Sequence, residues 1–400
     1  MVYQISQTVN ALPFLAYQKI YYDFFSNSQW EKHKAYAYNV DYWSGTGNIS
    51  LVTDMVQLRY ANYPKDYFMG MLPSSQYGSV SVLPSISSSS DSRSLLYYEP
   101  SSSAVAALQS AGGSSSSVRL SQTVSSSQGI RLNADLSALS IRATEYLQRW
   151  KEISQSGDSD YREQIRKHFG VNLPQSLSNM CTYIGGISRN LDISEVVNNN
   201  LAGSGDAAVI AGKGVGAGNG SFTYQTDEHC VVMCIYHAVP LLDYTITGQD
   251  GQLLVTDAES LPIPEFDNIG MEVLPMTQIF NSPKASIVNL FNAGYNPRYF
   301  NWKTKLDVVN GAFNTTLKSW VSPVTASLLS GWFGFGYDEK DVNKNTKVVL
   351  NYKFFKVNPS VLDPIFGVAA DSTWDTDQLL VNSYIGCYVA RNLSRDGVPY

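Results

Sequence analysis

The residues best suited to metal chemistry lie close together near the middle of the chain. His229, Cys230, Cys234 and His237 form a cluster of metal-ligating types, separated by β-branched and aromatic residues that favour a strand. Because side chains alternate along a strand, the cysteines would lie on one face and the histidines on the other, so the four could not converge on zinc. A helix would bring Cys230, Cys234 and His237 together. We predict the strand, with the cysteines packed as small apolar side chains.

A second candidate for ligand chemistry is segment 203–220, which holds seven glycines. A P-loop needs Ser or Thr after its Gly-Lys pair, but Gly214 follows Lys213. A dinucleotide-binding loop needs a preceding strand, and no convincing one is present. We therefore predict no nucleotide site, and we interpret the glycines as a backbone that passes through a confined place, such as a subunit junction.

Catalytic signatures are absent from the sequence. It contains neither a His-Glu-x-x-His nor a Gly-x-Ser-x-Gly motif, and its four histidines make the usual acid-base residue scarce. Asp371, Asp375 and Asp377 lie close together but lack the turn glycine and terminal glutamate of a calcium loop, which favours a solvated acidic turn. We predict that the chain is not an enzyme and holds no metal or other cofactor.

Basic and aromatic residues interleave in one short segment that contains Arg298, Trp302, Lys303 and Lys305. Rings that stack on bases, beside cations that neutralise phosphates, are the arrangement that binds single-stranded nucleic acid. A strand with one core face and one solvent face would produce the same pattern. The net charge is −6, so any nucleic-acid contact must be local. These four residues are our candidate DNA contacts.

The elements that would position these residues follow from hydrophobic periodicity. Apolar residues recur at three- and four-residue spacing in 12–25, 139–153 and 161–169, which predicts helices, and the stripes of the last two are expected to be core. Long irregular connections between short strands favour a β-sandwich or jelly roll over alternating βαβ units. The predicted strands are 222–224, 229–239, 252–256, 347–357 and 378–388.

One segment differs sharply in composition. Between residues 85 and 128, 19 of 44 residues are serine, so the segment has too few apolar side chains to form a core. It is either a flexible spacer or an exposed insertion that carries outward recognition. In the second case Tyr97 and Tyr98 are the candidate receptor-facing residues, because they could stack on a ligand.

Whole-chain composition points to interfaces. Only 16% of the 400 residues are charged, and 26 are tyrosines, which pack a ring and still hydrogen-bond at an interface. Four cysteines are too few for a disulfide scaffold, which is typical of a reducing compartment. The N-terminus lacks the pattern of a secretory signal, and no apolar run reaches the ~20 residues of a membrane helix.

Several phrases, beginning with LPFLAYQKIYYDFF, resemble in order the major capsid proteins of the Microviridae, the small tailless single-stranded DNA phages, and the gokushovirus-like lineages in particular. The similar phrases extend over most of the chain, at 12–25, 58–68, 72–78, 161–170, 183–186, 193–196, 227–244, 302–323 and 357–363.

The resemblance implies a mainly β fold, a viral jelly-roll sandwich or barrel with long insertions that contain helices. Its subunits would self-assemble into a T=1 icosahedral shell around circular single-stranded DNA, made in the bacterial cytoplasm and present in the virion. Partners would be other copies of the chain, a small basic DNA-binding protein and other phage proteins, the DNA genome, and possible host surface glycans; no membrane insertion is expected.

Four segments are expected within this fold: 1–84 with a helix and jelly-roll β structure, 85–128 as the serine-rich surface insertion, 129–190 as a helical insertion, and 191–400 with the remaining strands and loops. Family members carry a long segment ahead of the 12–25 helix that includes the first strands, so we expect a barrel that is incomplete at the N-terminus. Two other classes fit the composition: a carbohydrate-binding or adhesin-type β-sandwich, and a hydrolase on a β scaffold, which lacks catalytic signatures.

Overall fold

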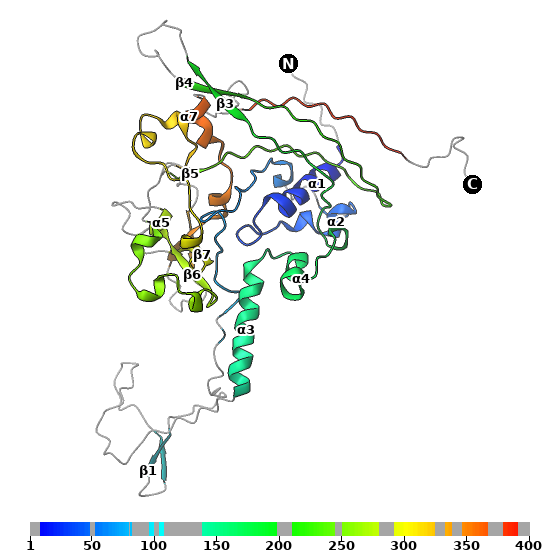
Figure 1. Cartoon of the computed structure of the whole chain (residues 1–400). Coiled ribbons are helices and arrows are strands. Elements are labelled where there is room, and N and C mark those ends of the chain that lie inside the picture. Colours follow the sequence, from blue (N-terminus) through cyan, green and yellow to red (C-terminus); the bar gives the residue numbers. More distant parts are fainter. Residues whose placement is uncertain are drawn as a thin grey trace, which may run out of the picture. The chain divides into compact units, whose positions relative to one another are not determined.

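The structure is a computed structural model (Figure 1). It describes residues 9–48, 53–79, 81, 96–99, 104–107, 138–197, 210–244, 250–279, 292–324, 333–337, 346–366 and 379–390. The chain divides into two compact units: Met1–Pro73 with Leu173–Tyr400, and Ser74–Asn172. The four segments expected from the sequence stay a prediction.

The helices of the described residues are short, with one exception. The α-helices are α1 (Leu12–Ile20), α2 (Val40–Trp43), α3 (Ala138–Ser156), α4 (Tyr161–Phe169), α5 (Met276–Ile279), α6 (Phe300–Lys303) and α7 (Asp363–Phe366). Two further helical turns matter below, the π-helix Tyr21–Phe25 and the 3-10 helix Tyr352–Phe355.

The strands form five two-stranded sheets within the described residues. The antiparallel pairs are β1 (Leu96–Glu99) with β2 (Ala104–Ala107), β3 (Asp192–Val197) with β4 (Ile210–Val215), β6 (Met271–Pro275) with β7 (Asn292–Pro297), and β9 (Phe333–Tyr337) with β10 (Thr346–Leu350). The fifth pair, β5 (Asp243–Tyr244) with β8 (Pro323–Val324), is parallel.

These small sheets do not confirm the mainly β fold predicted from the sequence. Of the predicted strands, only 347–357 contains a ladder, and it continues as a 3-10 helix from Tyr352. No strand forms at 222–224, at 229–239 or in the described part of 378–388. Segment 252–256 begins as a 3-10 helix. Residues with high β-propensity form a ladder only where a second strand offers its backbone in hydrogen-bonding register, and none of these segments has such pairing in the described part of the chain.

The helix predicted at 12–25 is confirmed as α1 and the π-helix that continues it. Pro13 occupies the first turn, where its missing N–H costs nothing, and the side-chain oxygen of Asn10 accepts the N–H of Leu12 at 3.0 Å. Leu15 and Ala16 are buried, whereas Pro13 and Phe24 of the predicted apolar stripe are exposed, so the face that packs differs from the predicted one.

Unit Ser74–Asn172 contains α3 and α4, which confirms both predicted helices. Gly170 has a left-handed φ of 69° and ends α4, as glycine does at helix C-termini. The prediction that their stripes form a core is wrong for both helices: Leu139, Tyr146 and Trp150 of α3 are exposed, and so are Tyr161 and Phe169 of α4. The cause is sparse packing, because the contacts of α3 within its unit are concentrated in its C-terminal half, where Trp150 stacks on His168 with ring centroids 5.5 Å apart.

The glycines of β4 make room for the side chains of the facing strand. A Cβ on Gly214 would lie 3.3 Å from Ile193, and one on Gly220 would lie 2.7 Å from Ile187. Residues 187 and 220 continue the register of the β3–β4 ladder beyond its last hydrogen-bonded pair. These glycines lie close to side chains of the facing segment but are exposed, so the predicted passage of 203–220 through a confined place stays a prediction. Residues 198–209 lie outside the described part.

The main core lies in the unit Met1–Pro73 with Leu173–Tyr400. Segment 61–72 runs through it: the N–H of Tyr63 bonds to the carbonyl of Phe355 at 2.9 Å, and Leu72 exchanges two hydrogen bonds with Tyr295 of β7. The residues buried in this core come from distant parts of the sequence: Tyr63, Tyr67, Phe68, Met69, Met71, Tyr244, Leu274, Met276, Ile279, Ala293, Leu350, Phe354 and Phe355.

A buried ion pair joins the π-helix region to the end of this core. Lys356 Nζ lies 2.7 Å from the carboxylate of Glu31, and both side chains are only about one-tenth exposed (11% and 10%). The hydroxyl of Tyr21 donates to the same carboxylate at 2.8 Å. Burial lowers the pKa of Lys356, an effect that the charge of Glu31 opposes. No α-helix among the described residues has the length and apolarity of a membrane span.

Candidate functional site

The predicted DNA-contact residues lie where β7 ends and α6 begins. Tyr299 joins the two elements with a φ of 61°, and it is the only non-glycine residue with positive φ in the described ranges. The half-buried carboxylate of Glu272, on β6, lies near the backbone of Tyr299 and Phe300 at the start of α6. Burial raises the pKa of Glu272, and the nearby backbone groups oppose the rise.

Arg298 is held by contacts within its own chain. Its guanidinium lies 5.1 Å from the ring centre of Tyr299 and 5.8 Å from that of Phe266, and it donates to the carbonyl of Glu259 at 3.0 Å. Because the guanidinium of Arg298 already stacks on these rings, it is less free to reach a phosphate.

The other three candidates differ in how available they are. Lys303 forms an ion pair with Asp267, and the half-buried indole N–H of Trp302 has no hydrogen-bond partner among the described residues. Lys305 is exposed. The structure thus brings Arg298, Trp302 and Lys303 to one corner, where Asp267 and Glu272 offset much of the positive charge, and Lys305 follows two residues beyond α6.

Tyr97 and Tyr98 lie on β1, in the serine-rich segment. The register pairs Tyr97 with Ala106 and Tyr98 with Val105 of β2. Within 85–128 the structure describes only these two strands. The insertion therefore contains a β-ladder, a feature that its serine-rich composition did not predict. The receptor-facing role of the two tyrosines stays a prediction.

The His/Cys cluster does not form a metal site in the part of the chain that the structure describes, where no three metal-ligating side chains converge. The predicted packing of Cys230 and Cys234 as small apolar side chains is wrong, because both are exposed. Their segment is extended and forms no ladder with another described strand, and the side of it that carries Cys230 and Cys234 is open to solvent. His237 instead packs against Phe25, with ring centroids 4.9 Å apart. Residues 371, 375 and 377 lie outside the described residues.

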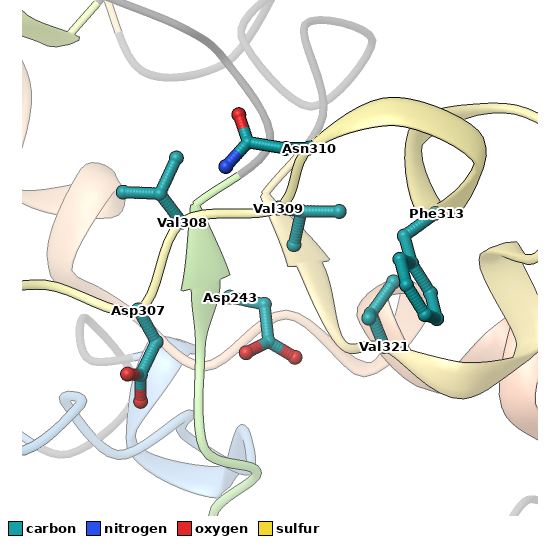
Figure 2. A pocket seen from close by; sticks show the side chains of 7 residues that line it. All are labelled: Asp243, Asp307, Val308, Val309, Asn310, Phe313 and Val321. Atoms are coloured by element: carbon teal, nitrogen blue, oxygen red, sulfur yellow. The ribbon is translucent and has the colours of Figure 1, made fainter.

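A cavity of about 290 Å³ lies beside β5 and β8 (Figure 2). Its lining combines two carboxylates with one amide and apolar side chains: Asp243, Asp307, Val308, Val309, Asn310, Phe313 and Val321. The carboxylate of Asp243 already accepts the backbone N–H of Ser322 at 3.0 Å. The lining holds no cation, so the cavity is not suited to bind phosphate, and its two carboxylates are the only lining groups that could take part in proton transfer.

Extended segments with exposed apolar side chains are the most prominent surface feature of the larger unit. Sequence reasoning placed strands here but missed that many of their apolar side chains are exposed. Within 211–241 the exposed residues include Val215, Phe222, Tyr224, Val231, Val232, Tyr236 and Leu241, and within 379–390 they include Leu380, Tyr384, Ile385, Tyr388 and Val389. Exposed apolar surface of this extent marks an interaction site.

Extensive apolar surface and a tyrosine-rich composition are typical of a protein that acts by association. The sequence matches the family described as "Capsid protein (F protein)" over residues 2–326. The chain belongs to this family. It is also 27% identical over 193 residues to the capsid protein VP1 of Chlamydia phage 1, a match that covers 45% of this chain and 32% of that relative. The chain's match thus spans about a third of the relative's length.

Family membership confirms the resemblance to Microviridae major capsid proteins. A capsid protein is a structural component of a virion, so the prediction that the chain is not an enzyme is confirmed as well. Membership also favours the capsid interpretation over the adhesin-type sandwich and the hydrolase.

Proposed function

We propose that this chain is the major shell subunit of a small tailless phage and assembles into an icosahedral capsid around circular single-stranded DNA. The observation that carries the proposal is the family match over residues 2–326. The exposed apolar segments support it, because a shell subunit must bury large surfaces against its own copies.

The proposed subunit fold is a viral jelly roll. Segment 216–241 supports it, because it is extended and rich in the residue types of strands. In this fold it would lie in ladders with further strands, which would satisfy its backbone groups and cover its apolar faces.

For the genome, we propose that Arg298, Lys303 and Lys305 face the inside of the shell, with Trp302 beside them. The exposed side chain of Lys305 supports this, and the partly exposed ring of Trp302 supplies a surface on which a base stacks. A separate small basic protein would neutralise most of the DNA, since this chain is acidic overall.

The test of the genome contacts is quantitative. Lys303→Gln with Lys305→Gln should reduce the DNA per particle while empty shells still form. Lys32→Gln, on another exposed lysine, is the matched control and should leave packaging unchanged. Equal packaging by all variants would contradict the assignment.

For the outside, we propose that 85–128 projects from the shell and makes polar contacts with host glycans through Tyr97 and Tyr98. Replacing 85–128 by a short Gly-Ser linker should leave assembly intact and reduce adsorption to the host. Loss of assembly would show a structural segment, and unchanged adsorption would show a spacer.

Assembly itself is tested by sedimentation velocity over a range of concentrations, with the protein made in bacteria beside the phage's other structural proteins. We expect discrete, large assemblies to form, and their share of the protein to increase with concentration. A stable monomer at every concentration would refute the proposed function.

A further inference from the structure

Residues 379–390 form an extended segment whose backbone has no partner among the described residues. No hydrogen bond joins its N–H and C=O groups to any other described segment. In Figure 1 it is the red trace that leads toward the C-terminus, without an arrow. A row of unpaired amides of this length is a template for adding another strand.

The side chains of this segment alternate as those of a strand do. Leu380, Tyr384 and Tyr388 share one face of the extended backbone, and they are 93%, 96% and 100% exposed. Val381 and Ile385, on the other face, are 51% and 65% exposed. Both faces are apolar, and one of them is uncovered.

The segment carries none of the devices that protect a free edge. None of its twelve residues is charged, and none is proline. Natural sheets keep edges from pairing with charged side chains, prolines or bulges. The lack of positive charge also argues against the DNA backbone as the partner, because phosphates need cations.

The exposed area is large enough for a protein interface. Two tyrosines that become buried contribute roughly 300–500 Å². This is a large share of the about 800 Å² that each partner buries in a stable interface. Leu380 and the half-exposed face add to it.

We propose that residues 379–390 pair as a β-strand with a second copy of this chain. The inference rests on the proposed shell function, which supplies identical copies at high local concentration. Backbone hydrogen bonds give the strand its affinity, and Tyr384 and Tyr388 fill pockets on the neighbouring copy.

The test is amide hydrogen exchange on the full chain, compared between assembled and dissociated protein. We expect the amides of 381–389 to exchange about a hundred-fold more slowly in the assembly than in the free subunit. The thiol of Cys387, exposed in the single chain, should lose its reactivity toward maleimide on assembly.

Variants separate the side-chain and backbone contributions. Tyr384→Ser with Tyr388→Ser should raise the concentration needed for association about ten-fold or more. The matched control, Tyr146→Ser with Tyr161→Ser, removes two exposed tyrosines from α3 and α4 and should leave that concentration unchanged. Asn382→Pro and Ser383→Pro remove N–H groups that point to opposite sides, so one of them must weaken pairing whichever edge is used.

Two results would overturn the inference while the shell function stands. One is fast amide exchange at 381–389 within a formed assembly. The other is equally slow exchange in the free subunit, because it would mean that the segment pairs within its own chain. A wild-type chain that never self-associates would overturn both the inference and the proposed function.

Discussion

The pair of Lys356 and Glu31 shows how single residues hold distant parts of the sequence together. Lys356 follows two buried phenylalanines, and Glu31 lies soon after the π-helix. Interleaved rings and lysines at 353–356 match a single-strand-binding pattern, yet here both rings are core and the second lysine is buried in an ion pair. Sequence alone could not show this, because the partner is more than 300 residues away.

Removing one member of this pair should be costly. Lys356→Met leaves the Glu31 carboxylate buried with Tyr21 as its remaining partner, and we expect the free energy of unfolding to fall by about 3 kcal/mol. The matched control is Lys34→Met, which breaks an exposed pair with Asp54 and should cost below about 1 kcal/mol. Denaturant unfolding measures both, and equal costs would contradict the buried-pair account.

Buried tyrosines predict how stability depends on pH. Burial raises the pKa of Tyr63 to about 12, and it also raises the pKa values of Tyr21, Tyr67 and Tyr244. Above pH 10 the unfolded chain therefore loses protons that the folded chain keeps. Stability should be fully present below pH 10 and fall between pH 10 and about 12, by up to about 1.4 kcal/mol per pH unit for each such group.

Tyr63→Phe checks this sign. The variant cannot ionise at that position, so its stability should fall less steeply with alkaline pH than that of the wild type. Unfolding measured at several alkaline pH values, with tyrosinate absorbance followed in parallel, gives both slopes. Identical slopes would show that Tyr63 plays no part.

Elements with local causes are the ones the sequence predicts well. The helix at 12–25 and the end of α4 at Gly170 follow from spacing, proline and glycine within a few residues. The strands at 229–239 and 378–388 were predicted from composition, but a ladder needs a second backbone, and composition does not specify where that backbone lies. For the same reason, the sequence could not show that the stripe on α3 is exposed.

The close packing around Gly294 tests how tightly β7 packs against the core segment that contains Met71 and Leu72. A Cβ there would lie 2.7 Å from the carbonyl oxygen of Leu72 and 2.9 Å from the sulfur of Met71. Gly294→Ala should therefore lower stability by about 1–3 kcal/mol, through overpacking against backbone that cannot move freely. The same change at Gly386, where the nearest atom is 3.8 Å away, should be close to neutral for folding of the single chain. Thermal unfolding distinguishes the two, and a neutral Gly294→Ala would show that β7 is loosely packed.

At the scale of the whole molecule, the family resemblance and the composition predicted a capsid protein, whereas the surroundings of the candidate DNA contacts became clear only from the fold. The phrases that carry the resemblance include 12–25 and 58–68, and these segments supply buried residues to the two clusters of the larger unit. Candidate DNA contacts were predicted from a run of basic and aromatic residues, but the acidic partners Asp267 and Glu272 lie elsewhere in the sequence and were missed. A residue pattern shows which chemistry is available, whereas charge balance depends on the fold.

Electron microscopy of the protein, produced in bacteria together with the other structural proteins of the phage, tests the central claim most directly. The account predicts closed particles of uniform diameter with icosahedral symmetry, in which 379–390 of each subunit contacts a neighbouring copy. Monomers, or irregular aggregates without symmetry, under conditions where the protein is folded would contradict it.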